Sequence, residues 1–364
     1  MRKNPRFLYV LLSLCTMISL NNCGSGEEGT TEFPSNGLEV ELVADGLDFP
    51  VTLVCTQDGR IFFNELQTGR IRIIQDSVLL PGAFATVPVS TDGENGLIGL
   101  ALDPDFEVNG FLYIYHTHPD PLRNRVLRFT DENNVGTDET VIVDNLPSAT
   151  NHVGGNIGFG PDGKLYVSLG DVLNPSNSQS LDNPAGKILR YNRDGSLPGD
   201  NPFSGSPIFA LGLRNSFDFA FHPVTGVIYA TENGPNCDDE INRIVPGGNY
   251  GWRPDYPCGD SDPRFISPIV RFTESIAPTG ITFYRGGQYP EFRDDLFFVN
   301  FDRGTEGKIQ RIELSGENLD RIVEISTFLV DGEFGGLLDI ITCSDGNLYF
   351  SNSNSIARII RSDE

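Results

Sequence analysis

A structural unit recurs six times along this chain of 364 residues. Each copy has an apolar strand, a turn that often carries Asp-Gly, and a second strand of the form Leu/Ile-Tyr/Phe-apolar. The second strand occurs at residues 61–63, 112–114, 165–167, 228–230, 296–298 and 348–350. A third strand, often Gly-Lys/Arg-Ile-x-Arg, follows at residues 69–73, 125–129, 186–191, 307–312 and 356–360. The copies lie about 51 to 68 residues apart, which is near the blade length of kelch-like propellers with insertions.

Repeats of this length predict an all-β fold, a six-bladed β-propeller with four-stranded antiparallel blades. No long stretch has a helical period, and turn residues separate short runs rich in aromatic and β-branched residues. We expect the propeller to occupy residues 37–364, with residues 38–43 completing the last blade. A β-sandwich or a pair of small β-domains would also use short strands, but six aligned copies favour the propeller.

The N-terminal segment has the pattern of an export signal. Arg2, Lys3 and Arg6 precede an apolar run over residues 7–20, which is too short for a membrane-spanning helix. Residues 1–22 are therefore expected to be a signal peptide of the lipoprotein type, with Cys23 lipidated and residues 23–36 forming a flexible acidic linker. The prediction is an exported bacterial protein, periplasmic or on the cell surface, that contacts a membrane only through a lipid anchor.

The chain is strongly acidic, with 26 Lys+Arg, 50 Asp+Glu and a formal net charge of −24. Such a surface repels nucleic acid and anionic lipid, so neither is expected as a partner. The same carboxylates are potential oxygen ligands for a hard cation such as calcium, although a solvated surface accounts for most of them.

Four cysteines lie outside the expected signal peptide and lipid site: Cys55, Cys237, Cys258 and Cys343. In an oxidising compartment they allow three pairings. Cys55 and Cys343 occupy equivalent positions of the first and last repeats, which become neighbours when a ring closes. We therefore favour a Cys55–Cys343 clasp and a Cys237–Cys258 bridge. Two unpaired thiols remain the alternative at the clasp, because equivalent positions do not ensure the required Cα separation.

Candidate catalytic residues lie in the longest insertions, in the third and fourth repeats. His152 heads a strand after a loop, where a histidine can act as a general base. Asp171 ends the next strand and can orient the imidazole or balance its charge. Arg214 offers a fixed positive charge for an anion or a developing negative oxygen. Gly154 and Gly155 allow backbone or ligand to approach closely.

A candidate calcium loop covers residues 234–240. Its sequence, Gly-Pro-Asn-Cys-Asp-Asp-Glu, provides three consecutive carboxylates and carbonyl groups that a turn can direct inward. An acidic run alone is more often a solvated loop, and a lone histidine is more often structural. The functional interpretation therefore depends on the combination of these segments.

Together and in this order, the segments resemble the soluble glucose/sorbosone dehydrogenase family, the pyrroloquinoline quinone (PQQ)-dependent aldose sugar dehydrogenases. The resemblance extends over roughly residues 38–362. It includes the motifs GENGLIG at 93–99, LDPDF at 102–106, GKILR at 186–190, NRDG at 192–195, DNPF at 200–203 and SIAPTG at 275–280. The family implies a propeller that oxidises the C1 hydroxyl of an aldose to the lactone and passes the electrons to an external acceptor. We expect a monomer or a homodimer.

The resemblance also implies roles for matching residues. His152 matches the general base that takes the proton of the anomeric hydroxyl, and Asp171 matches the carboxylate that supports it. Glu94, Arg214 and Asn215 match residues near the cofactor, with Arg214 beside the quinone oxygens. The implied calcium ligands are Gly234 and Pro235 through their carbonyls, Glu240 through its carboxylate and Tyr250 through its carbonyl.

Two positions depart from the family pattern. Asp302 stands where the family has a lysine before Arg-Gly, which leaves Arg303 as the candidate cofactor-binding cation there. Residues 336–339, Gly-Leu-Leu-Asp, lack the arginines that open the family's last blade. Because PQQ is a tricarboxylate, both changes weaken its expected binding. The alternative is a non-catalytic, calcium-stabilised propeller that binds a carbohydrate or a protein. A calcium-dependent lactonase is a further alternative, but the sequence shows no ring of inward Glu, Asn and Asp residues for it.

Overall fold

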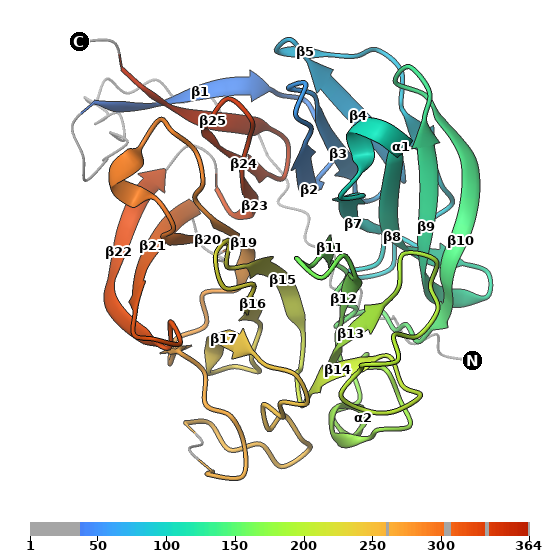
Figure 1. Ribbon diagram of the computed structural model, residues 1–364, viewed down its shortest axis with the longest axis vertical. Coiled ribbons are helices and arrows are strands. Elements are labelled where there is room, and N and C mark those ends of the chain that lie inside the picture. Colours follow the sequence, from blue (N-terminus) through green and yellow to red (C-terminus); the bar gives the residue numbers. More distant parts are fainter. Residues whose placement is uncertain (1–36, 260–261, 302–306, 332–334, 363–364) are drawn as a thin grey trace, which may run out of the picture.

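The six repeats form six antiparallel sheets arranged around a common centre (Figure 1). The computed structural model describes residues 37–259, 262–301, 307–331 and 335–362. The expected signal peptide, the lipid site at Cys23, the linker and the candidate cofactor residue Arg303 lie outside the described residues. Within these ranges, no helix has the length and apolar character needed to cross a membrane.

The predicted blades of four antiparallel strands are confirmed, and the first blade has one additional short strand. The first blade contains β2 (Pro50–Cys55), β3 (Ile61–Glu65), β4 (Arg70–Gln75), β5 (Val78–Leu79) and β6 (Ala85–Thr86). The second contains β7 (Leu97–Leu102), β8 (Phe111–Pro119), β9 (Leu122–Asp131) and β10 (Gly136–Leu146). The third contains β11 (Ile157–Phe159), β12 (Leu165–Leu169), β13 (Lys187–Tyr191) and β14 (Ile208–Leu211). The fourth contains β15 (Ser216–Phe221), β16 (Ile228–Glu232), β17 (Asp239–Ile244) and β18 (Val270–Phe272). The fifth contains β19 (Pro278–Phe283), β20 (Leu296–Asn300), β21 (Gly307–Ser315) and β22 (Arg321–Asp331). The sixth contains β23 (Leu337–Thr342), β24 (Leu348–Asn352), β25 (Ile356–Arg361) and β1 (Leu38–Ala44). Short helices, α1 (Phe106–Asn109), α2 (Ser176–Gln179) and η1 (Pro290–Phe292), lie in connections between strands.

The two ends of the chain close the ring in the last blade. Strand β1 pairs with β25, with Leu38 opposite Arg361 and Ala44 opposite Ile356. The predicted closure by residues 38–43 is confirmed, with one residue more. The inner strands β2, β7, β11, β15, β19 and β23 each contact the next around the centre, including β23 against β2 (Figure 1).

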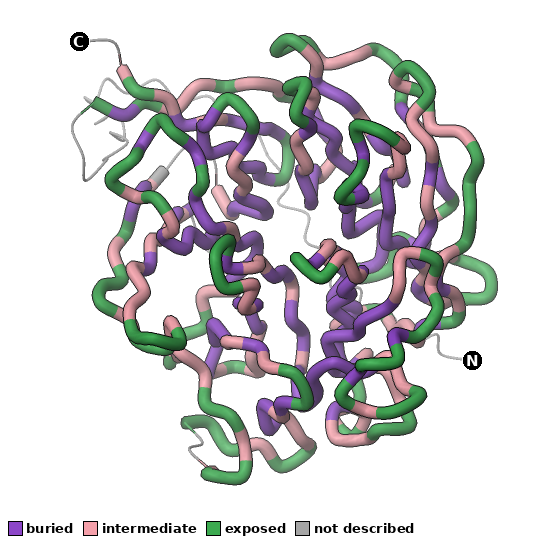
Figure 2. The backbone as a smooth tube through the Cα atoms, viewed as in Figure 1, coloured by how far each residue is buried: buried purple, intermediate pink, exposed green. Residues whose placement is uncertain are grey.

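The second strand of a blade is the most buried. All residues of β3, β12, β16, β20 and β24 are buried. Each of these strands pairs on both edges and has a neighbouring blade against each face, so both sets of alternate side chains are buried rather than one. Exposed residues gather instead on outer strands and connecting loops (Figure 2). This burial explains why the repeat is clearest in the second strand.

Two carboxylates are buried on inner strands, at Asp218 and Asp339. Asp339 Oδ2 accepts the N–H of Leu53 at 2.6 Å and joins the last blade to the first. Asp218 Oδ2 accepts the N–H of Ile281 at 2.8 Å and joins the fourth blade to the fifth. Burial raises the pKa of both carboxyls, and the charge of Asp339 raises the pKa of Asp218 further. These inward carboxylates, which the sequence did not indicate, serve as acceptors for hydrogen bonds between blades.

Both favoured disulfides are present. The Cα atoms of Cys55 and Cys343 lie 5.4 Å apart, and those of Cys237 and Cys258 lie 6.1 Å apart. The first bridge joins the end of β2 to the turn after β23 and therefore clasps the first blade to the last. The second joins the turn between β16 and β17 to the insertion between β17 and β18 in the fourth blade. Disulfides of this kind are typical of proteins in oxidising compartments, in agreement with export.

Candidate active site

His152 and Asp171 form a hydrogen-bonded pair at one end of the third blade. His152 precedes β11 and Asp171 follows β12, so the antiparallel pairing of these strands brings both to the same end. His152 Nδ1 lies 2.7 Å from Asp171 Oδ1, and the two side chains are 15% and 1% exposed. With the carboxylate as acceptor, Nδ1 carries the proton and the lone pair of Nε2 is free. No residue in the described ranges forms a hydrogen bond with Nε2, which is therefore available to a substrate.

The backbone around this pair adopts uncommon conformations. The φ angles of His152, Val172 and Leu173 are 58°, 51° and 62°, all in the left-handed region. Such residues cost about 1–3 kcal/mol each and collect at functional sites. A Cβ on Gly170 would lie 2.2 Å from the carbonyl oxygen of His152, so glycine is required there. The expected close approach at Gly154 is to the backbone of β12 rather than to a ligand.

Glu94 and Asn215 connect the second and fourth blades to the His152 loop. Glu94 Oε2 accepts the backbone N–H of His152 at 2.7 Å and the side-chain amide of Asn215 at 3.3 Å. Asn215 Oδ1 in turn accepts the N–H of Gly154 at 3.0 Å. Asn215 is buried, and together with Glu94 it holds the His152 loop by hydrogen bonds. Glu94 is exposed, so its carboxylate remains accessible to a ligand.

Arg214 lies beside Asp171, since its carbonyl accepts the N–H of Asp171 at 2.7 Å. Its guanidinium Nη1 donates to the carbonyl of Asn233 at 2.8 Å and its central carbon lies 5.6 Å from the centre of the Trp252 ring. In the part of the chain that the structure describes, this guanidinium forms no ion pair. The buried carboxyl of Glu232 accepts the backbone N–H of Arg214 at 2.8 Å, and burial raises the pKa of Glu232 to about 7. Among the described residues, the site therefore presents a guanidinium without an ion pair near the ring of Trp252, whose indole bonds to Asp171.

The acidic loop does not use its three carboxylates as the sequence suggested. Asp239 is buried, and its carboxylate accepts the N–H groups of Gly234, Ile276 and Ala277 at 2.8, 2.7 and 2.8 Å. It also accepts the hydroxyl of Ser275 at 2.9 Å. The oxygens of Asp239 are therefore occupied in shaping the loop, which leaves Asp238 and Glu240 as the other two carboxylates of the expected calcium loop.

Asp238 and Glu240 are buried with one guanidinium nearby. Arg271 Nε lies 3.9 Å from Asp238 Oδ2 and 3.7 Å from Glu240 Oε1. Burial raises the pKa of Glu240 to about 7, and the charge of Asp238 contributes to the increase. Two carboxylates against one guanidinium leave an excess of negative charge that a bound cation would neutralise.

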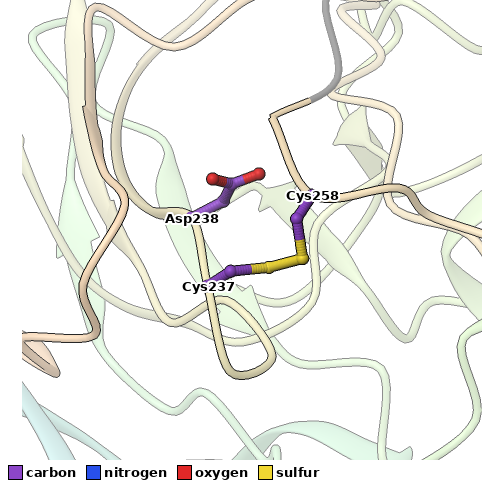
Figure 3. A group of neighbouring side chains, drawn as sticks. All are labelled: Cys237, Asp238 and Cys258. Carbon is purple, nitrogen blue, oxygen red and sulfur yellow. A yellow bond between two sulfur atoms is a disulfide. The ribbon is translucent and has the colours of Figure 1, made fainter.

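Asp238 lies next to the Cys237–Cys258 disulfide (Figure 3). One potential ligand atom of each of these three residues lies within 4.8 Å of the others. Both sulfurs are joined in the disulfide, however, so only the carboxylate can bind a metal. The group thus offers an oxygen ligand to a hard cation and no thiolate to a soft one.

A cavity of about 20 Å³ lies between Arg214 and the acidic loop. This volume accommodates roughly one water molecule or one ion. Backbone carbonyls and buried carboxylates are the ligands that calcium prefers, so the lining fits the expected metal. The four residues expected to bind calcium, Gly234, Pro235, Glu240 and Tyr250, all line it together with Glu232, Asp238 and Trp252.

The order of segments and the propeller match a family model. The model described as Glucose / Sorbosone dehydrogenase matches residues 47–361, which is most of the chain. The chain belongs to the glucose/sorbosone dehydrogenase family.

Relatives within the glucose/sorbosone dehydrogenase family cover most of the propeller. Quinoprotein glucose dehydrogenase B of Acinetobacter calcoaceticus is 33% identical over 69% of this chain and 60% of its own length. Aldose sugar dehydrogenase YliI of Escherichia coli (strain K12) is 27% identical over 89% of this chain and 92% of its own. The PQQ-bound form of aldose sugar dehydrogenase from Streptomyces coelicolor has a TM-score of 0.78 and 28% identity, over 90% of this chain and 99% of that one.

The described residues fit the quinone of this glucose/sorbosone dehydrogenase family on one side of the site. Arg214 supplies a guanidinium that forms no ion pair with the described residues, and the neighbouring residue Asn215 supplies a buried amide. On the other side, Leu337 and Leu338 are 0% and 3% exposed at the start of β23, so that edge offers apolar side chains to the core and no cation. Arg303 lies outside the described residues.

The structure adds residues to the site that were not predicted from the sequence. Trp252 donates its indole N–H to Asp171 Oδ2 at 2.8 Å. Lys187 is fully buried, and its ammonium donates to the carbonyls of residues 177, 178 and 185, which holds the loop after Asp171. The available signals were a single tryptophan in the chain and a lysine within an apolar strand.

Proposed function

We propose that the chain is an exported quinoprotein that oxidises the C1 hydroxyl of an aldose to the lactone, with calcium-bound PQQ as the hydride acceptor. An external acceptor would take up the two electrons of the oxidation, and the protons would pass to solvent. The observation that carries this proposal is the buried Asp171 carboxylate bonded to His152 Nδ1, with Nε2 left free and the backbone carbonyl of Arg214 bonded to the N–H of Asp171.

The residues of the chain handle the proton of the reaction. His152 Nε2 accepts the proton of the sugar hydroxyl as the C1–H bond breaks. The Asp171 carboxylate stabilises the resulting imidazolium and holds the ring with Nδ1 protonated. PQQ, when bound, supplies the acceptor for the hydride of C1. The exposed carboxylate of Glu94 is placed to accept a hydrogen bond from another sugar hydroxyl.

Cofactor and metal would be held by different elements. Arg214 and Asn215, at the start of β15, would bind the quinone, and Arg303 is the proposed contact from the fifth blade. Calcium would neutralise the excess charge of the acidic loop and polarise the quinone oxygens. Its proposed ligands are Gly234, Pro235, Glu240 and Tyr250.

The proposal extends to where the protein works. Residues 1–22 would direct export, and a lipid on Cys23 would hold the propeller at the cell surface or in the periplasm through the linker of residues 23–36. Incorporation of labelled palmitate that is lost in Cys23→Ala tests the anchor.

Titration of the purified protein with PQQ and calcium, followed by the quinone absorbance and by aldose-dependent dye reduction, tests the activity. His152→Asn is the informative variant, because its amide can still donate to Asp171 while Nε2 is lost. We expect it to retain quinone uptake and lose at least about a hundredfold in kcat, as for removal of a general base. His118→Ala is the control, because the ring of His118 accepts the N–H of Asp120 and does not bond to the pair. Absence of saturable PQQ uptake, or of turnover with a broad panel of aldoses, would overturn the proposal.

A further inference from the structure

The carboxylate of Asp171 is hydrogen-bonded through both oxygens. Oδ1 accepts from His152 Nδ1 at 2.7 Å and from the N–H of Leu173 at 2.9 Å. Oδ2 accepts from the indole Nε1 of Trp252 at 2.8 Å. An indole N–H can only donate a hydrogen bond, so this bond stabilises the charged form of the carboxylate. Rotation of the Asp171 side chain would break at least one of the three bonds.

The indole is itself held by the insertion of the fourth blade. The backbone N–H of Trp252 donates to the carbonyl of Gly212 at 2.9 Å, and its carbonyl accepts the side-chain amide of Gln179 at 2.8 Å. The indole ring lies 5.3 Å from the ring of Tyr256, and the guanidinium of Arg214 lies 5.6 Å from its centre. Trp252 therefore links the proton-handling pair to the cationic side of the site.

We infer that Trp252 is a positioning residue for the catalytic base: its N–H fixes the rotation of the Asp171 carboxylate and, through it, the orientation of the His152 ring. The consequence for turnover rests on the proposed function. The effect on His152 does not, because the hydrogen bonds belong to the chain itself. A carboxylate held by three donors presents Oδ1 to Nδ1 and leaves Nε2 directed at the substrate.

Other charged groups act on His152 less directly. Glu94 bonds to His152 through its backbone N–H and not through its ring, and the guanidinium of Arg214 donates to the carbonyl of Asn233. In the described ranges, Asp171 is the side chain that bonds to the imidazole. A change made at Trp252 therefore reaches the ring through this one carboxylate.

Trp252→Phe tests the inference because it keeps an aromatic ring beside Arg214 and removes the N–H. In the cofactor-free protein, we expect the NMR titration midpoint of the His152 ring to move to higher pH by about half a unit, since the carboxylate loses a donor that shares its charge. The chain has four histidines, and His152→Asn identifies the resonance. The control Tyr113→Phe removes a hydroxyl that donates to the carbonyl of Arg193 at 3.1 Å and should leave the midpoint unchanged.

A second replacement keeps the test valid where the phenylalanine variant folds poorly. The chain has one tryptophan, so biosynthetic incorporation of benzothienylalanine replaces only that N–H by sulfur. In protein loaded with PQQ and calcium, both changes should lower kcat about tenfold and change KM less than about twofold. A His152 midpoint within about 0.1 unit of the wild-type value in both altered proteins overturns the inference. A shifted midpoint in protein that takes up no PQQ supports the positioning role and overturns the proposed function.

Discussion

The Cys55–Cys343 disulfide joins residues 288 positions apart, and its loss should destabilise the propeller more than loss of the other bridge. A disulfide lowers the conformational entropy of the unfolded chain according to the size of the loop that it closes. For separations of 288 and 21 residues, this relation gives about 5.7 and about 3.3 kcal/mol at room temperature. We predict that Cys55→Ala/Cys343→Ala lowers the free energy of unfolding by about 2 kcal/mol more than Cys237→Ala/Cys258→Ala does.

The folded ring allows the bridge to be separated from side-chain packing. Strand β1 pairs with β25 independently of the disulfide, so the variants should still close the ring. Cys343 is 9% exposed and packs with Leu53 and Tyr349, so its truncation also removes apolar contacts. The single variant Cys55→Ala breaks the bridge and leaves the Cys343 side chain in this core. It should account for most of the loss seen in the double variant.

Equilibrium urea unfolding, followed by the fluorescence of the single tryptophan, measures these differences. All samples are compared under the same calcium concentration, because a bound ion would add its own stabilisation. Equal losses for the two pairs of cysteines would refute the argument from loop size. An unchanged midpoint for Cys55→Ala would mean that the pairing of β1 with β25 suffices to hold the ring.

Three further predictions concern the site. In EDTA, the free energy of unfolding should fall between pH 4.5 and pH 7, by about 3 kcal/mol at most for Glu240. The reason is that the Glu240 carboxyl of the unfolded chain loses its proton near pH 4.5, whereas the buried carboxyl of the folded protein keeps its proton to about pH 7. Glu240→Gln should flatten this decline in urea unfolding at about pH 5 and pH 8, and a decline equal to that of the wild type would contradict the assignment. Asp239→Asn should weaken calcium binding about tenfold by calorimetry, because its amide cannot accept the N–H groups of Gly234 and Ala277 together; unchanged affinity would exclude a role in shaping the loop. Lys187→Met should lower the free energy of unfolding by about 3 kcal/mol through three carbonyls left without their donor, and a change below about 1 kcal/mol would show that water replaces the ammonium.

The architecture was predictable because the burial of a strand is visible in its own short stretch of sequence. A second strand enclosed on both faces requires consecutive apolar and aromatic residues, and six such triplets at blade spacing leave few alternatives to a propeller. The pairing of the cysteines was predicted from the equivalent positions of Cys55 and Cys343 in the repeat, because equivalent positions of the first and last blades meet when the ring closes. The same repeat identified residues 38–43 as the closing strand.

The site was predictable in its members more than in its contacts. His152, Asp171 and Arg214 stood out because they lie beside strands in the longest insertions, those of the third and fourth repeats. The different roles of the carboxylates in the acidic loop were not predictable, because Asp239 and Glu240 are chemically alike and adjacent in the sequence. Their difference arises from the connection between the fourth and fifth blades, where residues 275–277 direct three donors at Asp239.

The sequence by itself determined a ring of six β-blades, its closing strand and the residue types of a proton-handling pair, because strand periodicity and repeat spacing are properties of neighbouring residues. Only the tertiary structure decided which carboxylate organises the loop, which lines the cavity, and that the indole of Trp252 holds Asp171. These contacts join residues of different blades, and their distances exist only once packing around the ring has set the blades against one another.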